Sequence, residues 1–227
     1  MRTRRTSGNG KLIVTLVVAV AIVLMAAGFL QTPRTNVTPK DTVPPAIFLP
    51  GPVTFAPGLH LLGALAPSVA YVIDTGDGLI LVDAGLEDSH ELLLQQLQHL
   101  QLDIQNLKLI LLTHGHGDHY LGARAMQRRT NAEIYAGKGD CDVLRQAGPR
   151  EAVFSTFPMA HVSIHETVVD RELIGGEVIE IGDTRIEVIA TPGHTPGSIC
   201  YQMKRNGQTA LFSGDTIMTI SGDLGTY

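Results

Sequence analysis

The feature that most constrains this chain is the segment 114–119, which reads His-Gly-His-Gly-Asp-His and directly follows the apolar run 108–113. An apolar run of this length is too short for a typical helix, so it predicts a strand that is buried on both faces. The strand leads into three imidazoles and one carboxylate, a donor set that suits a zinc-type cation. The glycines allow the loop to present these side chains in two directions, which is compatible with two adjacent metals.

The same arrangement, a short strand followed by ligand-type residues, recurs twice downstream. Residues 188–190 lead into Thr-Pro-Gly-His, which ends at His194, and residues 210–212 lead into Ser-Gly-Asp, which ends at Asp215. Three strand ends thus present histidine or aspartate. This pattern argues against the alternative of a histidine-rich surface tract that binds nothing specifically.

Apolar periodicity and turn residues predict an α+β domain around these segments. Short β-rich runs at 70–73 and 79–82 are separated by a glycine-containing turn and predict an antiparallel hairpin. Asp88 and Glu91 resemble a capping box for an amphipathic helix that ends near Asp103. Further short helices are expected after Tyr120 and over 142–146, and further strands over 133–135, 177–181, 185–190, 198–203 and 209–212. Strands, then helices, then strands again fit two packed sheets with helices outside.

The N-terminal region differs in character from this domain. Residues 12–30 contain no charged side chain, and a helix of this length approaches the ~30 Å hydrocarbon thickness of a bilayer. Arg2, Arg4, Arg5 and Lys11 precede it, so the positive-inside rule predicts a cytoplasmic N-terminus and an extracytoplasmic domain. We interpret the stretch as an uncleaved membrane anchor. The alternatives are a cleaved signal peptide, which would give a secreted or periplasmic protein, and a buried core helix.

Four segments follow from this interpretation. A basic cytoplasmic segment, 1–11, precedes the transmembrane helix or signal, 12–30. Residues 31–58 hold seven of the twelve prolines, which disfavours a regular helix and predicts an extended linker. The folded domain is expected over residues 59–227.

Charge and cysteine content limit the partners that the sequence predicts. The formal net charge is −5, and no long Lys/Arg run occurs outside the N-terminus, so nucleic acid is not an expected partner. Cys141 and Cys200 lie far apart in the chain and form no paired metal spacing, which favours plain buried thiols. The expected partners are a small-molecule substrate and, through the N-terminal helix, a membrane.

Three motifs carry a resemblance to a known family. Thr-His-Gly-His-Gly-Asp-His at 113–119, Thr-Pro-Gly-His-Thr-Pro-Gly-Ser at 191–198 and Phe-Ser-Gly-Asp-Thr at 212–216 are similar to successive motifs of the metallo-β-lactamase fold superfamily, which includes β-lactamases and glyoxalase II-like hydrolases. Val-Asp-Ala-Gly at 82–85 matches the family's early strand-end aspartate. The resemblance runs from about residue 60 to the end, and it implies an αββα sandwich of two mixed β-sheets with outer helices.

The resemblance also implies a role for each motif residue. Asp83 would orient the ligands from behind through hydrogen bonds. The superfamily usually supplies one more histidine to the second metal from a later strand, whereas no histidine follows His194 here. The second site therefore lacks this usual ligand, and we expect a domain that is incomplete at its C-terminus. The implied ligands are His114, His116 and His194 for the first metal, Asp118 and His119 for the second, and Asp215 as the bridge.

A hydrolytic mechanism follows from the resemblance. The sequence contains no Gly-x-Ser-x-Gly elbow, so the implied nucleophile is a metal-bound hydroxide that attacks a carbonyl. Asp118 is the expected catalytic residue, because its carboxylate could orient the nucleophile or receive its proton. Zn²⁺ is the expected cofactor, with two ions per chain, and iron is the alternative.

The substrate class stays open at this level. Cyclic amides, esters and thioesters all fit, and a β-lactam ranks narrowly first because an exported domain lacks access to cytosolic thioesters. Asp215 argues the other way, because β-lactamases of the family commonly place Cys or Ser at the bridging position. The alternatives are a non-catalytic or single-metal binding domain and a di-iron relative.

Overall fold

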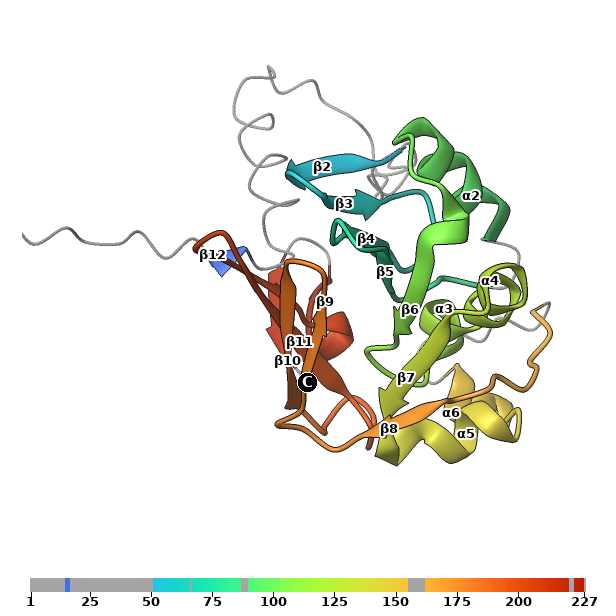
Figure 1. Cartoon of the computed structure of the whole chain (residues 1–227). Helices are drawn as coiled ribbons and strands as arrows, with labels where there is room; N and C mark the ends of the chain where they lie inside the picture. Colours follow the sequence, from blue (N-terminus) through green and yellow to red (C-terminus); the bar gives the residue numbers. More distant parts are fainter. Residues whose placement is uncertain are drawn as a thin grey trace, which may run out of the picture.

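Two β-sheets pack face to face in the computed structural model of the chain, and helices cover the outer face of the larger sheet (Figure 1). The α+β class and the two packed sheets are therefore confirmed. In the part of the chain that the structure describes, helices cover this outer face only. The described residues are 15–16, 51–65, 67–86, 90–154, 162–220 and 223–226.

The larger sheet has seven strands in the order β2-β3-β4-β5-β6-β7-β8. Strands β2 to β5 pair antiparallel and strands β5 to β8 pair parallel, so the sheet is mixed. The predicted hairpin is confirmed as β4 and β5. Because β5, β6 and β7 are parallel, their carboxyl ends lie at one edge of the sheet. The bounds are β2 Val53–Ala56, β3 Leu59–Leu62, β4 Ala70–Asp74, β5 Leu79–Val82, β6 Leu107–Leu111, β7 Glu133–Gly137 and β8 Arg171–Leu173.

The smaller sheet has five strands in the order β1-β12-β11-β10-β9. Strands β10 and β12 are both antiparallel to β11, so they run in the same direction and also end at one edge. A separate hairpin, β13 and β14, follows. The bounds are β1 Thr15–Leu16, β9 Val178–Ile181, β10 Thr184–Ala190, β11 Ile199–Arg205, β12 Gln208–Phe212, β13 Ile217–Ile220 and β14 Asp223–Thr226.

The helices are short, and most of them connect successive strands of the larger sheet along the chain. Leu93 and Leu97 of α2 are buried against that sheet, as the helical spacing predicts. The α-helices are α2 His90–His99, α3 Gly117–Tyr120, α4 Ala123–Thr130, α5 Cys141–Arg145 and α6 Arg150–Val153, and the 3₁₀ turns are η2 Ile104–Asn106, η3 Lys138–Asp140 and η4 Gly214–Thr216.

Helix α2 ends earlier than the sequence predicts. It stops at His99 because Gln101 adopts a left-handed conformation, with φ of 60°, and the Leu102 N–H bonds back to the Leu97 carbonyl. Asp103, expected near the helix end, instead caps the next turn by accepting from the backbone N–H of Gln105 at 2.9 Å. Of the predicted capping box, Asp88 lies outside the described residues, whereas Glu91 lies in the first turn of α2.

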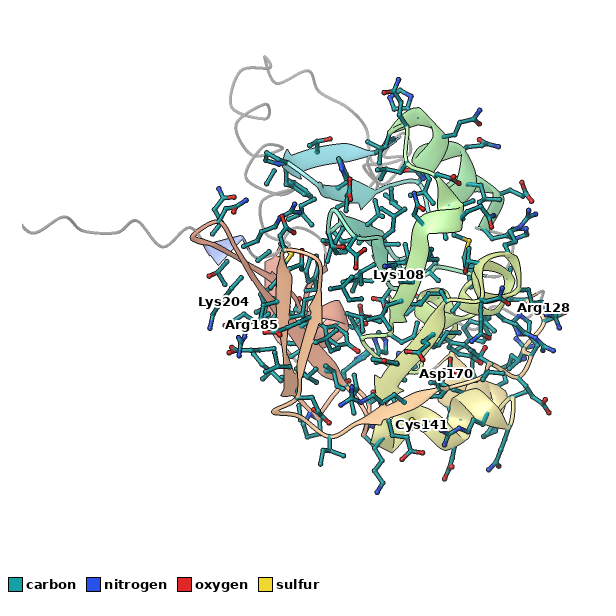
Figure 2. The ribbon with its side chains drawn as sticks, in the orientation of Figure 1. Lys108, Arg128, Cys141, Asp170, Arg185 and Lys204 are labelled. Carbon is teal, nitrogen blue, oxygen red and sulfur yellow. The ribbon has the colours of Figure 1, made fainter. Side chains whose placement is uncertain are left out.

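The space between the two sheets is filled by apolar side chains from both. Ile80 and Leu111 of the larger sheet and Ile186 and Tyr201 of the smaller sheet are fully buried there. Burying each such side chain stabilises the fold by about 1.5–3 kcal/mol. The opposite face of the smaller sheet carries charged side chains, and Figure 2 shows Arg185 and Lys204 pointing away from the larger sheet.

The folded domain begins earlier than predicted. Strand β2 falls inside the range 31–58 that was expected to be linker, and it forms the edge of the seven-stranded sheet. Pro52 and Pro57 flank this strand without interrupting it, because an edge strand tolerates proline at its ends. No helix among the described residues is long and apolar enough to cross a membrane, and apart from β1 the predicted span 12–30 lies outside those residues.

Candidate metal centre

The ends of four strands place the predicted site residues together. Asp83 follows β5, and the loop that begins at His114 follows β6. From the smaller sheet, β10 leads into the loop of His194, and β12 leads into the turn of Asp215. Because both sheets present these ends on the same side, segments far apart in the sequence meet in one buried cluster.

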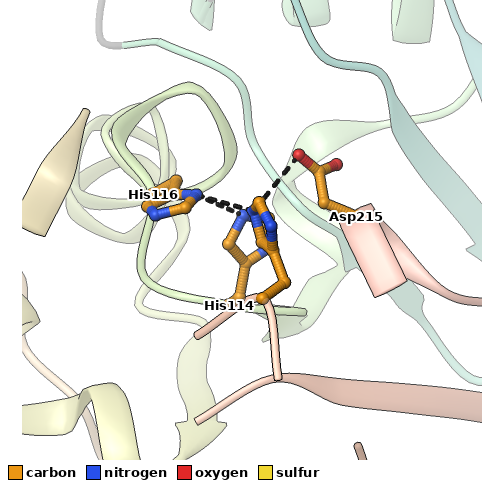
Figure 3. A group of neighbouring side chains, drawn as sticks. His114, His116 and Asp215 are labelled. Atoms are coloured by element: carbon orange, nitrogen blue, oxygen red, sulfur yellow. Dashed lines mark hydrogen bonds and ion pairs between the residues drawn. The ribbon is translucent and has the colours of Figure 1, made fainter. Parts of the chain in front are cut away.

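Four side chains form the centre of this cluster, which we call the four-ligand cluster: His114, His116, His194 and Asp215. One ligand atom from each lies within 4.8 Å of all the others. His116 Nδ1 lies 3.1 Å from His114 Nε2 and 2.8 Å from His194 Nε2. His194 Nε2 lies 3.4 Å from Asp215 Oδ2. Figure 3 shows His116 pointing toward His114, with Asp215 on the other side of the group.

The donor set fits a single zinc-type cation. Zinc in proteins is tetrahedral with Zn–N distances of about 2.0–2.1 Å, which puts neighbouring ligand atoms about 3.4 Å apart. The three separations given above run from 2.8 to 3.4 Å, so they are equal to this value or slightly shorter. Three imidazoles and one carboxylate therefore converge, as the sequence pattern predicts, and three of their separations are close to those of a zinc site.

His119 and Asp118 lie next to the four-ligand cluster. His119 Nε2 is 3.3 Å from Asp215 Oδ1 and 3.6 Å from Asp118 Oδ2. Asp215 thus faces His194 with one oxygen and His119 with the other. This is the arrangement expected if Asp215 stands between two cation positions, and it brings together all six predicted ligands.

Asp83 supports the cluster from behind. Its carboxylate bonds the Nδ1 atom of His119 at 2.9 Å, and it accepts from the backbone N–H and the hydroxyl of Thr113 at 2.8 Å each. Thr113 in turn lies 3.1 Å from His114 Nδ1. With Asp83 only 3% exposed, this network sets the orientation of two histidines from the protein interior.

Burial keeps three of the histidines neutral. It lowers the pKa of His114 well below its ordinary value, and it lowers the pKa of His116 to about 4, assisted by the neighbouring imidazoles. The pKa of His194 is lowered for the same main reason. Neutral imidazole is the form that binds metal, so these side chains are held ready as ligands.

His119 and the carboxylates behave differently. Burial opposes a charge on His119, but Asp118, Asp83 and Asp215 together raise its pKa well above the ordinary value. Burial raises the pKa of Asp118. The pKa of Asp215 is lowered despite burial, because His119 first, and then His194 and His116, favour its anion. The centre is therefore rich in negative charge on the His119 side, which favours a cation there.

One residue of the site was missed by sequence reasoning. Asp140, at the end of η3 after β7, is 3% exposed and bonds to the loops of His114 and His194. An available signal was its place after a strand, as for Asp83. The other described histidines, His60, His90, His99 and His165, are not members of the four-ligand cluster.

The comparison with known families agrees with this geometry. The family model described as the metallo-beta-lactamase superfamily matches residues 63–227, which is more than half of the chain. The chain belongs to the metallo-beta-lactamase superfamily. The match contains every predicted site residue and confirms the resemblance that the motifs carry.

Several relatives of this superfamily member are named as hydrolases. Hydroxyacylglutathione hydrolase GloC of Haemophilus influenzae is 27% identical over 154 residues, covering 68% of this chain and 68% of GloC. The probable polyketide biosynthesis zinc-dependent hydrolase PksB of Bacillus subtilis is 30% identical over 113 residues, covering 50% of this chain and 40% of PksB. These names support the predicted class, a metal-dependent hydrolase.

A solved structure shows the same fold. BJP-1, a subclass B3 metallo-beta-lactamase of Bradyrhizobium japonicum, is 29% identical with a TM-score of 0.63, and the match covers 71% of this chain and 61% of BJP-1. This superfamily member thus spans about three fifths of BJP-1 and about two thirds of GloC.

Proposed function

We propose that the protein is a zinc-dependent hydrolase that cleaves a carbonyl substrate, namely a cyclic amide, an ester or a thioester. The observation that carries the proposal is the four-ligand cluster, whose candidate ligand atoms lie within 4.8 Å of one another. The family match supports a hydrolase, and the name of PksB supports zinc. The donor set of neutral imidazoles with carboxylate suits zinc better than calcium or magnesium, which prefer oxygen ligands.

In this proposal the chain's own residues divide the work. His114, His116 and His194 would hold a first ion, His119 and Asp118 would hold a second, and Asp215 faces both sets of ligands. Zinc at this centre supplies a Lewis acid for the carbonyl and lowers the pKa of water to about 7.

Asp118 is the proposed proton acceptor. Its side chain is 17% exposed, so it is more open to solvent than His119, which is 5% exposed. Burial raises the pKa of its carboxyl above the ordinary value, which makes it a stronger base than a free aspartate. Ser68 donates a hydrogen bond to the backbone carbonyl of Asp118 and fixes this part of the loop.

The relatives point to two substrate classes. BJP-1 is a β-lactamase, and GloC is named for a glutathione thioester. We rank a β-lactam narrowly first, because BJP-1 shares the fold and because we propose an extracytoplasmic location. Asp215 stands where β-lactamases of the family commonly place Cys or Ser, so we also test thioesters and lactones.

Elemental analysis and hydrolysis of three probes test the proposal. The full chain is assayed with a chromogenic cephalosporin, a glutathione thioester and an aryl lactone, before and after chelation and zinc return. We expect bound zinc, chelator-sensitive turnover of at least one probe, and a loss of at least 100-fold in His116→Ala. His99→Ala, which removes an exposed histidine, is the matched control and should retain activity. Turnover that persists without metal would contradict the proposal.

We also propose, from the sequence alone, that residues 12–30 anchor the chain with its domain outside the cytoplasm. Fractionation of cells expressing the full chain tests this. An anchored protein resists alkaline extraction from membranes, and deletion of 12–30 releases it. Recovery of the full-length chain in the soluble fraction would contradict anchoring.

A further inference from the structure

Asp140 joins two loops that carry metal ligands. Its Oδ2 atom accepts from the backbone N–H of Gly115 at 2.7 Å and from the hydroxyl of Thr195 at 2.6 Å. Its Oδ1 atom accepts from the backbone N–H of Gly197 at 2.8 Å. Gly115 lies between His114 and His116, whereas Thr195 directly follows the third histidine of the cluster. One carboxylate therefore bonds to the chain immediately beside all three imidazole ligands.

The burial of Asp140 makes these three bonds matter. An ionised carboxylate in the interior costs several kcal/mol unless hydrogen-bond donors compensate it. Asp140 is 3% exposed, so its compensation comes from these protein donors. Moving either loop would lengthen at least one bond to a buried charge. The carboxylate thus resists separation of the two loops.

The turn after Thr195 is itself fixed. Ser198 accepts from the Thr195 N–H at 3.0 Å, and the two hydroxyls lie 2.8 Å apart. Both residues are buried. The Thr195 hydroxyl is consequently oriented toward Asp140 from its own loop, and the bond between them links two ordered segments.

Glycines allow the two backbones to meet at this point. A Cβ atom at Gly197 would lie 2.4 Å from the Asp140 backbone nitrogen, and one at Gly137 would lie 1.9 Å from the Gly197 carbonyl oxygen. A Cβ at Gly139 would lie 2.5 Å from Pro196 backbone atoms. These contacts involve backbone atoms, which cannot swing aside. The loop after β7 and the loop before β11 are therefore packed directly together, with Asp140 between them.

We propose that Asp140 is a positioning residue of the metal centre, which holds His194 at ligand distance from His114 and His116. The inference rests on the proposed zinc centre but not on any particular substrate. Asp140 hydrogen-bonds to residues beside the ligands, and through these residues it fixes the positions of the three imidazoles. Outer partners of metal ligands change metal affinity by about 10–100-fold when they are removed.

Zinc affinity of the full chain tests the proposal, measured by competition with a chromogenic chelator. Asp140→Asn puts an amide N–H₂ opposite at least one of the three donors, so we expect a zinc Kd raised by about 10-fold or more. Asp142→Asn, which removes an exposed carboxylate two residues away, is the matched control and should leave the Kd unchanged. The absorption spectrum of the Co²⁺-loaded protein should also change in Asp140→Asn, because it reports coordination geometry.

Thr195 provides a second, milder test. Thr195→Val removes one of the three donors at nearly constant volume and should raise the Kd several-fold, whereas Thr195→Ser keeps the hydroxyl and should restore it. If Asp140→Asn does not fold, this pair decides the question. A Kd and Co²⁺ spectrum equal to wild type in a folded Asp140→Asn, or in Thr195→Val, would overturn the proposal and leave Asp140 a stabilising residue only. Failure of the wild-type chain to bind zinc would instead overturn the proposed function.

Discussion

Asp83 combines an uncommon backbone with a position behind the ligands. Its φ of 57° lies in the left-handed region, which Asn and Asp tolerate better than other side chains. From there its carboxylate bonds both Thr113 and the Nδ1 atom of His119. The role that the resemblance implied for this residue, orienting ligands through hydrogen bonds, therefore has a physical basis in the structure.

Asp83→Asn tests this orienting role. Asparagine keeps the backbone conformation but removes the charge that fixes His119, so we expect zinc affinity to fall by about 10–100-fold. The measurement is chelator competition at fixed pH. Asp77→Asn, at an exposed carboxylate, should bind zinc as the wild type does. An unchanged affinity in Asp83→Asn would show that the hydrogen bond to His119 does not matter for binding.

The buried histidines predict how the stability of the metal-free protein depends on pH. The folded pKa of His116 is about 4, against 6.5 for a free histidine, so only the unfolded chain gains this proton as pH falls from 6.5 to 4. Stability should fall over this window by about 1.4 kcal/mol per pH unit for each such histidine. The raised pKa of His119 has the opposite sign, so its contribution is complete below 6.5 and is lost as pH rises toward its folded pKa.

Denaturant unfolding in the presence of chelator, from pH 4.5 to 8.5, measures both limbs. His116→Asn should flatten the acidic limb, and His119→Asn should flatten the alkaline limb. Parallel curves for wild type and both variants would contradict the assigned directions of the two pKa shifts.

At the scale of elements, the sequence predicted strands better than helix ends. The runs that became β4, β5 and β6 are apolar and bounded by turn residues, so their pattern is local and readable. The end of α2 at His99 depends on a left-handed residue, Gln101, which no periodicity signals. Strand β8 is short and mostly exposed, and it forms because the edge of β7 is available for pairing.

The start of α4 depends on a close approach of two backbones. The Gly122 N–H bonds the Gly85 carbonyl at 2.9 Å, and a Cβ atom at Gly122 would lie 2.2 Å from the Ala84 carbonyl oxygen. Gly122→Ala should therefore lower the free energy of unfolding by about 1–3 kcal/mol. Gly51→Ala is the control, since nothing lies within 4 Å of its added Cβ, and it should change stability by less than about 0.5 kcal/mol. Equal stabilities of the two variants in urea would contradict this close packing.

For the whole molecule, the metal centre connects the two sheets. His114 and His116 follow the larger sheet, whereas His194 and Asp215 follow the smaller one. Zinc that binds only the folded state should stabilise it by about 2.7 kcal/mol at a free concentration of 100 times Kd. For a chain of this size that raises Tm by about 5–10 °C.

Thermal unfolding with zinc and with chelator measures this effect. Magnesium at the same concentration should give no shift, because it prefers oxygen ligands. His194→Ala removes the ligand from one side and should abolish most of the zinc-dependent shift. The same shift in His194→Ala as in wild type would place the stabilising zinc elsewhere.

The sequence by itself determined the family and the candidate donors, because each motif is contiguous in the chain and follows a readable strand. Only the tertiary structure decided how these donors converge, since that depends on strand order and on the packing of the two sheets. Asp140 shows the difference most clearly. It lies 25 residues from Gly115 and 57 from Gly197, and no local pattern links them. It reaches both because β7 pairs beside β6 and because the loop of His194 packs against the turn after β7.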